Sequence, residues 1–140
     1  MKVRCLANNF LELKNKIQID RLLKVYFGLP NGELNLRRNQ EYTVYGILYI
    51  DKHPWYFLCL DKYDEYPVTF PADLFEIIEP SLSSYWRLVT HNSDTPDIFS
   101  GFVIPEWSEN ESFYENLVDG DPKSEAIFTK YRKLMDEEFN

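Results

Sequence analysis

The sequence is poor in the patterns from which catalytic and metal sites are built. Its two cysteines, Cys5 and Cys59, form no Cys-x-x-Cys pair, and no His-Glu-x-x-His pattern occurs, so the common zinc-binding spacings are missing. The five glycines are scattered, and no glycine-rich loop is present to hold a phosphate group. The two histidines, His53 and His91, fall in turn-like stretches, where solvated imidazoles are expected. We therefore expect a protein that is not an enzyme and that uses no metal and no cofactor.

Long apolar runs are also missing. No segment approaches the roughly 18 apolar residues that a membrane-spanning helix needs. The opening "MKVRCLANNF" lacks the apolar stretch of a signal peptide. Two cysteines without a signal favour a reduced, cytoplasmic protein with no membrane contact. Both cysteines fall on predicted strands, where buried thiols are expected.

Basic residues are in the minority and are unevenly placed. The chain has 15 Lys and Arg against 23 Asp and Glu, a formal net charge of −8. Residues 1–40 have a net charge of +5, whereas residues 41–105 have −7 and residues 106–140 have −6. Such an acidic surface repels nucleic acid and membranes and attracts basic partners. The alternative is that the acidic charge serves only solubility.

Apolar residues make up 44% of the chain, which is sufficient for one domain with its own core. Helical spacing predicts a short helix at residues 16–27. Pro71 is expected at the first position of a single helical turn. Alternating, β-branched and aromatic residues predict strands at residues 1–7, 41–50, 55–61, 67–70 and 76–79. Short polar turns join these strands, which indicates a small, strongly bent antiparallel sheet or barrel.

The pattern changes after Pro80. Residues 81–90 are apolar and aromatic and are expected to pack back on the barrel, and residues 98–104 are expected to add a strand. Two helices follow, near 109–118 and 122–138.

Local signals delimit these two helices. Ser108, with Glu111 three residues later, fits a capping box at the start of the first helix. Gly120 suits its end, and Asp121 and Pro122 suit the cap and first turn of the second helix. The apolar residues of the second helix share one face: Ile127, Phe128, Tyr131, Leu134 and Met135.

The stretch "FPADLFEII" resembles the segment that ends SH3 domains, where a Phe/Ile-Pro-x-Asn-Tyr-Val pattern forms a 3₁₀ turn before the last strand. "WYFLCLD" begins sixteen residues before Pro71, about where SH3 domains have their tryptophan pair. The resemblance covers residues 41–79. Leu74 stands where peptide-binding SH3 domains have a tyrosine, and their Ala-Leu-Tyr-Asp-Tyr segment is missing. The resemblance therefore implies the SH3-like fold rather than a proline-rich ligand.

This resemblance implies an α+β protein with a small SH3-like antiparallel β-barrel, an inserted short helix and a C-terminal two-helix extension. The barrel is expected to span residues 1–80, with the helical insertion near 16–27. The extension is expected to span residues 81–140 and to pack on the barrel.

In size, acidity and lack of catalytic patterns the sequence resembles bacterial immunity proteins, which neutralise a cognate toxin domain. The resemblance implies a protein partner, in particular a basic toxin domain that an acidic surface attracts electrostatically. Exposed aromatic side chains flanked by acids would then supply most of the binding free energy. The candidate partner-binding residues are Tyr63, Asp64, Glu65, Tyr66, Glu106, Trp107, Glu109 and Glu111.

Two other functions fit the sequence. One is a phage or mobile-element protein, either an SH3-like adaptor or a mimic of DNA. The other is an SH3-like protein that binds nucleic acid through its basic N-terminal third, which holds Lys14, Lys16, Arg21, Lys24, Arg37 and Arg38. Against nucleic-acid binding stands the net charge of −13 over residues 41–140. If the protein does not bind nucleic acid, these basic residues are expected to pair with acids of the same chain.

Overall fold

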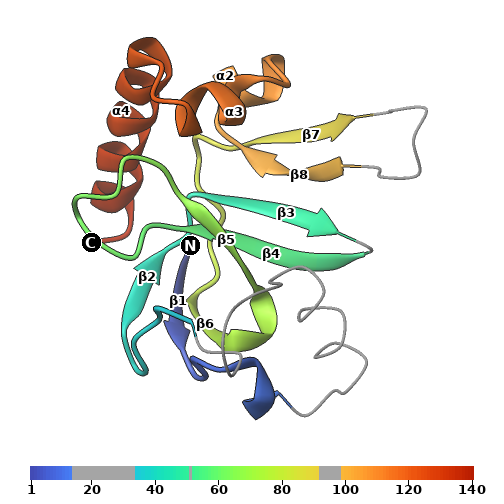
Figure 1. Cartoon of the computed structure of the whole chain (residues 1–140), viewed down its shortest axis with the longest axis vertical. Helices are drawn as coiled ribbons and strands as arrows, with labels where there is room; N and C mark the ends of the chain where they lie inside the picture. The colour runs from blue at the N-terminus through green and yellow to red at the C-terminus, as the bar shows by residue number, and fades with distance from the viewer. Residues whose placement is uncertain (14–33, 51, 92–98) are drawn as a thin grey trace.

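The computed structural model describes residues 1–13, 34–50, 52–91 and 99–140. Within these residues the chain is an α+β protein with two antiparallel sheets and three α-helices (Figure 1). The strands are β1 (Lys2–Cys5), β2 (Glu41–Thr43), β3 (Gly46–Ile50), β4 (His53–Leu58), β5 (Val68–Pro71), β6 (Phe75–Glu79), β7 (Arg87–His91) and β8 (Phe99–Val103). The helices are α2 (Pro105–Glu109), α3 (Phe113–Val118) and α4 (Pro122–Glu138), with 3₁₀ turns η1 (Phe10–Glu12) and η3 (Ala72–Leu74).

The smaller sheet has the strand order β2-β1-β6, and both pairings are antiparallel. Alternation along β1 buries Val3 and Cys5 completely, while Lys2 and Arg4 lie on the outer face. The strand predicted at the start of the chain is thus confirmed.

The larger sheet has the order β5-β4-β3-β8-β7 and is antiparallel throughout. The backbone of β8 lies very close to β3 at Gly101, where a Cβ atom would stand 2.0 Å from the carbonyl oxygen of Ile47. Only glycine permits this approach, so Gly101 allows the β7–β8 hairpin to extend the sheet beyond β3.

The single strand predicted at residues 41–50 is wrong in one respect, because the structure divides it into β2 and β3. These two strands belong to different sheets, and only Val44 and Tyr45 lie between them. Val44 is completely buried and Tyr45 nearly so, hence the chain passes from one sheet to the other through the core. The α+β class is confirmed, but the described strands are hydrogen-bonded into two open sheets rather than one closed barrel.

The 3₁₀ corner predicted after Pro71 is confirmed as η3. Pro71 itself is the last residue of β5 and precedes the turn, with a φ of −64°, so its predicted position inside the turn is wrong by one residue. Leu74 is completely buried, and the next residue, Phe75, begins β6.

Strand β7, at Arg87–His91, is not predicted from the sequence. Trp86 precedes it and is buried, with its Nε1 donating to the Tyr45 carbonyl oxygen at 3.1 Å. The Trp86 ring stacks on Phe102 of β8 at a centroid distance of 6.4 Å. The strand predicted at 98–104 is confirmed as β8, and the helix predicted at 16–27 lies outside the described residues.

Helix α4 begins and ends where the sequence predicts. The Asp121 carboxylate accepts hydrogen bonds from the Ser124 backbone nitrogen at 2.9 Å and from its hydroxyl at 2.7 Å, and Pro122 opens the helix. Gly120 has a φ of +82°, in the left-handed region that glycine tolerates best. The predicted apolar face is buried at Phe128, Tyr131 and Met135.

The helix predicted near 109–118 is confirmed at its end and wrong at its start, since α3 ends at Val118 but begins at Phe113, and a separate short helix, α2, precedes it. Ser108 lies inside α2, and its hydroxyl donates to the Pro105 carbonyl oxygen at 2.6 Å instead of capping a helix. Asn110 ends α2 with an extended φ of −135°. The break lets α2 and α3 both turn an aromatic side chain, Trp107 and Phe113, into the core.

The larger sheet is packed on both faces. On one face, the Phe57 ring meets Trp107 of α2 and Tyr114 of α3 at centroid distances of 4.8 and 5.4 Å. On the other, Tyr56 and Phe70 meet Phe75 of the smaller sheet at 6.0 and 6.5 Å. Figure 1 accordingly shows the helices at one end of the molecule and the smaller sheet at the opposite end.

Candidate partner-binding surfaces

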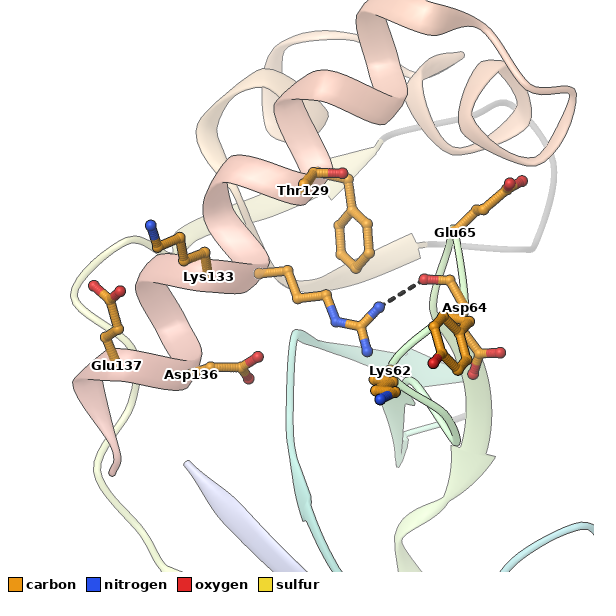
Figure 2. A pocket seen from close by; sticks show the side chains of 10 residues that line it. Lys62, Asp64, Glu65, Thr129, Lys133, Asp136 and Glu137 are labelled. Carbon is orange, nitrogen blue, oxygen red and sulfur yellow. Dashed lines mark hydrogen bonds between the residues drawn. The ribbon is translucent and has the colours of Figure 1, made fainter.

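The predicted binding residues fall on two surfaces that flank α4. The first is a groove of about 440 Å³ between residues 62–65 and residues 128–137 of α4, the turn groove (Figure 2). The second is a groove of about 490 Å³ between residues 106–116 of the α2–α3 segment and residues 121–127 at the start of α4, the acidic groove. The two sets of predicted residues are therefore separate surfaces rather than one site.

The turn that forms one wall of the turn groove is held by its own aspartates. The backbone nitrogens of Leu60 and Asp61 donate to Asp64 Oδ2 at 2.7 and 2.9 Å. The backbone nitrogen of Tyr63 donates to Asp61 Oδ1 at 2.9 Å. The bond between Tyr63 and Asp61 is typical of an Asx turn, in which the side chain accepts from the N–H group two residues on, whereas Asp64 accepts from N–H groups at the start of the turn. The predicted binding residue Asp64 is therefore committed to shaping the turn.

Arg132 of α4 ties this turn to the helix. Its two terminal nitrogens donate to the carbonyl oxygens of Asp64 at 2.6 Å and Asp61 at 2.8 Å, and Figure 2 shows the first of these bonds. The guanidinium carbon lies 5.8 Å from the centroid of the Tyr45 ring, and the Tyr45 hydroxyl donates to Asp136 at 2.6 Å. Burial, followed by the bond to Asp136, raises the pKa of Tyr45. Arg132 and Asp136 thus serve internal contacts.

The predicted exposure of Tyr63 is confirmed. Its exposed fraction is 77%, and the Nζ atom of Lys62 lies 4.8 Å from its ring centroid. Tyr66 is only partly exposed and packs against the core. The exposed charges of the groove are balanced, with Lys62 and Lys133 against Glu65 and Glu137.

The predicted exposure of Trp107 is wrong. This side chain is 5% exposed and packs under α2 against three rings of the core. It stacks on Tyr114 at a centroid distance of 5.1 Å and meets Phe113 at 5.9 Å, in addition to Phe57. The glutamates near it in sequence indicated a surface position, but successive residues of a helix point about 100° apart, so Trp107 is buried while Glu109 is exposed. Trp107 holds α2 in place and is not accessible to a partner.

The acidic groove combines an apolar floor with carboxylates. Phe113 and Ile127 supply the apolar part, and Glu106 and Glu109 supply two of the carboxylates. Glu109 is exposed, whereas Glu106 is only partly exposed. Glu106 Oε1 accepts a hydrogen bond from the Tyr131 hydroxyl at 3.2 Å. Glu111, the remaining predicted residue of this surface, is exposed nearby but does not line the groove.

The acidic charge of the C-terminal third is concentrated around this groove. Residues 105–126 contain seven acidic side chains and one basic side chain, Lys123, whereas residues 127–140 contain three of each sign. The net charge of residues 106–140 taken together does not show that the acidic excess lies before residue 127. The same residues form α2, α3 and the start of α4, so the fold gathers most of the excess acidic charge on one segment.

Part of the basic N-terminal third is paired internally. Arg4 contacts Glu76 at 2.7 Å and Glu41 at 3.9 Å. Arg38 pairs with Glu12, and its other terminal nitrogen donates to the Leu6 carbonyl oxygen at 3.0 Å. Lys14, Lys16, Arg21 and Lys24 lie outside the described residues, and Arg37 is exposed. Of the two predicted nucleic-acid contacts that lie in the described residues, Arg38 therefore neutralises an acid of the same chain, and Arg37 is exposed.

Three residues weighed for catalysis, His53, Cys5 and Cys59, lie in contacts of the fold. His53 Nε2 lies 2.5 Å from Asp73 Oδ2, so this histidine is paired with η3 rather than simply solvated. Cys5 and Cys59 are buried as predicted, and burial raises the pKa of the Cys59 thiol to about 12. Residues 1–13, 34–50, 52–91 and 99–140 contain no cluster of three His, Cys, Asp or Glu side chains that could bind a metal ion. None of the helices in these ranges has the length and apolar character needed to span a bilayer.

Comparison with known proteins adds no relative. No protein-family model matches the sequence, and neither a curated protein nor a solved structure matches the chain significantly.

Proposed function

We propose that this chain is a non-enzymatic, cytoplasmic protein-binding protein, and most specifically an immunity protein that neutralises a cognate basic toxin domain. The observation that carries the proposal is the acidic segment of residues 105–126, with seven acids against one base around a groove of about 490 Å³. Opposite charge accelerates encounter with a basic domain, and a groove with an apolar floor gives contact area once the two have met.

An SH3-like relationship for residues 1–80 is part of this proposal. It is supported by the order of β1, the bent β2–β3 segment, β4, β5, η3 and β6, in which β2 and β3 serve different sheets and a 3₁₀ turn precedes the last strand. Trp55 is 2% exposed, and Pro71 and Leu74 are buried, so these three residues offer no open surface to a proline-rich peptide. The proposed partner surface therefore lies on the helices and not on the SH3-like corner.

Co-expression with a toxin domain encoded beside this gene tests the proposal. That domain alone should stop bacterial growth, and co-expression of this chain should restore it. Association of the two purified proteins should slow as salt rises, because screening weakens electrostatic steering. The double variant Glu109→Lys/Glu111→Lys should associate about ten-fold more slowly at low salt and lose most of this salt dependence.

A matched control changes two exposed acids outside the acidic groove, Glu41→Lys/Glu137→Lys, and alters net charge by the same amount. This control should associate within about two-fold of the wild-type rate. Equal slowing by both double variants would show that only net charge matters. Recovery of nucleic acid rather than a basic protein on pull-down would refute the proposal, and capture of a DNA-binding protein that DNA displaces would favour a DNA mimic.

A further inference from the structure

The exposed charges of the turn groove are balanced, on a chain whose net charge is −8. Lys62 and Glu65 lie on the turn, and Figure 2 shows them across the groove from Lys133 and Glu137 of α4. Two copies of an acidic chain repel each other where acidic surfaces meet. That repulsion is absent where each copy brings two exposed charges of each sign, so this surface is complementary to itself.

The other charged side chains of the groove already have partners within the chain. Asp64 accepts from two backbone nitrogens of the turn, and Arg132 donates to the carbonyl oxygens of residues 61 and 64. Asp136 accepts from the Tyr45 hydroxyl. These bonds fix the turn against α4. A surface that is ordered in advance loses less conformational entropy on association than a mobile one.

Tyr63 places an exposed ring beside the groove. Its side chain is 77% exposed, and the groove of about 440 Å³ is lined from α4 by Phe128 and Thr129. A tyrosine that becomes buried removes about 150–250 Å² from water, and tyrosines are frequent hot spots of interfaces. A protruding ring and a groove on the same surface allow two copies related by a twofold axis to exchange their rings.

We propose that the chain forms a twofold-symmetric dimer through the turn groove, in which Tyr63 of each copy packs into the groove of the other. The exposed lysines of one copy then face the exposed glutamates of the other. Because the contact is limited to one turn and part of α4, it should be smaller than the standard ~800 Å² per partner, with a dissociation constant of about 10⁻⁴ M. The acidic groove is lined by other residues, so the dimer does not depend on the proposed function.

Sedimentation equilibrium of the full chain at low salt tests the proposal. Between about 10 µM and about 1 mM, the average mass should rise from that of one chain toward that of two. Tyr63→Ser should weaken dimerisation at least about ten-fold, because it removes the ring that fills the groove. Leu88→Ser changes a side chain that is 67% exposed on β7, outside the groove, and should stay within about two-fold of wild type.

Charge reversal adds a test in which association is regained. Lys62→Glu/Lys133→Glu makes the exposed charges of the groove acidic, and Glu65→Lys/Glu137→Lys makes them basic, so each variant alone should stay monomeric. An equimolar mixture should form a heterodimer at least as stable as the wild-type dimer, which would also show that both variants fold. Adding Tyr63→Ser to both variants should weaken this heterodimer about ten-fold, which distinguishes the groove contact from attraction by charge alone.

Four results would overturn the proposal. They are the mass of a single chain at every concentration, equal effects of Tyr63→Ser and Leu88→Ser, a mixture of charge variants that stays monomeric, and a mass that grows beyond two chains. The last result would indicate a head-to-tail contact that does not close. Growth rescue by toxin co-expression is a separate readout, so failure of the dimer leaves the immunity function standing, and failure of growth rescue leaves the dimer standing.

Discussion

At the scale of single residues, the chain separates side chains that shape a surface from side chains that a partner can reach. The side chains of Asp64 and Arg132 form hydrogen bonds with backbone groups, while the Tyr63 side chain beside them is 77% exposed. Trp107, flanked by glutamates, is buried, and Glu109 two residues later is exposed. Proximity in sequence is therefore a poor guide to which residues share a role.

The link between Arg132 and the turn predicts a stability effect. Arg132→Met keeps the apolar stem but removes two hydrogen bonds from a charged donor, so the free energy of unfolding should fall by about 1.5–3 kcal/mol. Lys133→Met, at the exposed neighbouring position, should change it by less than about 0.5 kcal/mol. Urea unfolding of the two variants measures the difference. Equal destabilisation would mean that the Arg132 bonds contribute nothing beyond net charge.

At the scale of elements, the larger sheet is completed by a long-range step, the addition of the β7–β8 hairpin to β3. It depends on close approach at Gly101, where a Cβ atom would lie 2.0 Å from the Ile47 carbonyl oxygen. At Gly46, a Cβ atom would meet its nearest neighbours, Phe102 and Phe57, at 3.2 Å. The two glycines of the same sheet therefore tolerate substitution to different degrees.

Gly101→Ala should lower the free energy of unfolding by at least about 3 kcal/mol, because backbone must move to admit the methyl group. Gly46→Ala should cost less, about 1–2 kcal/mol, since a side chain supplies one of its close contacts and can shift. Thermal unfolding of both variants gives the order. A smaller loss for Gly101→Ala than for Gly46→Ala would contradict the pairing of β8 with β3.

The elements also show which parts of the fold are readable from sequence. Helix α4 is predicted correctly because Gly120, Asp121 and Pro122 act within one turn of the chain. The capping box at Ser108 is misleading because burial of Trp107, a long-range contact with Phe57, decides where α2 ends. Counting charges along the sequence locates the acidic region. It does not show which acids are exposed, because exposure depends on contacts between residues distant in sequence.

The same limit applies to the strands. Residues 41–50 are rich in β-branched and aromatic residues, and the one local break among them is Gly46, which stands where β3 begins. A single glycine inside a strand pattern does not by itself show that the chain changes sheet. The change of sheet is set by the pairing of β2 with β1 and of β3 with β8, strands that are distant in sequence. The 3₁₀ corner is predicted because Pro71 and the residues after it form a local turn signal.

At the scale of the whole molecule, buried titratable groups make stability depend on pH in the alkaline range. Burial raises the pKa of Cys59 from 9.0 to about 12 and that of Tyr114 from 10.0 to about 12. In the unfolded chain these groups lose their protons at lower pH than in the folded protein. The stabilisation is therefore complete below about pH 9 and is lost as pH rises toward 12.

The free energy of unfolding should accordingly fall between about pH 9 and 11, and Cys59→Ala should show a shallower decline because one of the contributing groups is removed. Urea unfolding at several pH values measures both slopes. In parallel, the Cys59 thiol should react with a thiol reagent at least about a hundred-fold more slowly in the native than in the unfolded protein. Identical slopes for wild type and Cys59→Ala would contradict the assignment to this thiol.

The way in which Arg132 holds the turn has a consequence for how such a protein diversifies. Arg132 binds the carbonyl oxygens of residues 61 and 64, groups that every amino acid provides. The side chains at positions 62, 63 and 65 are exposed and take no part in that clamp. Mutation can therefore change the side chains that the turn exposes while its shape persists, so a lineage can vary the chemistry of this edge without rebuilding the fold.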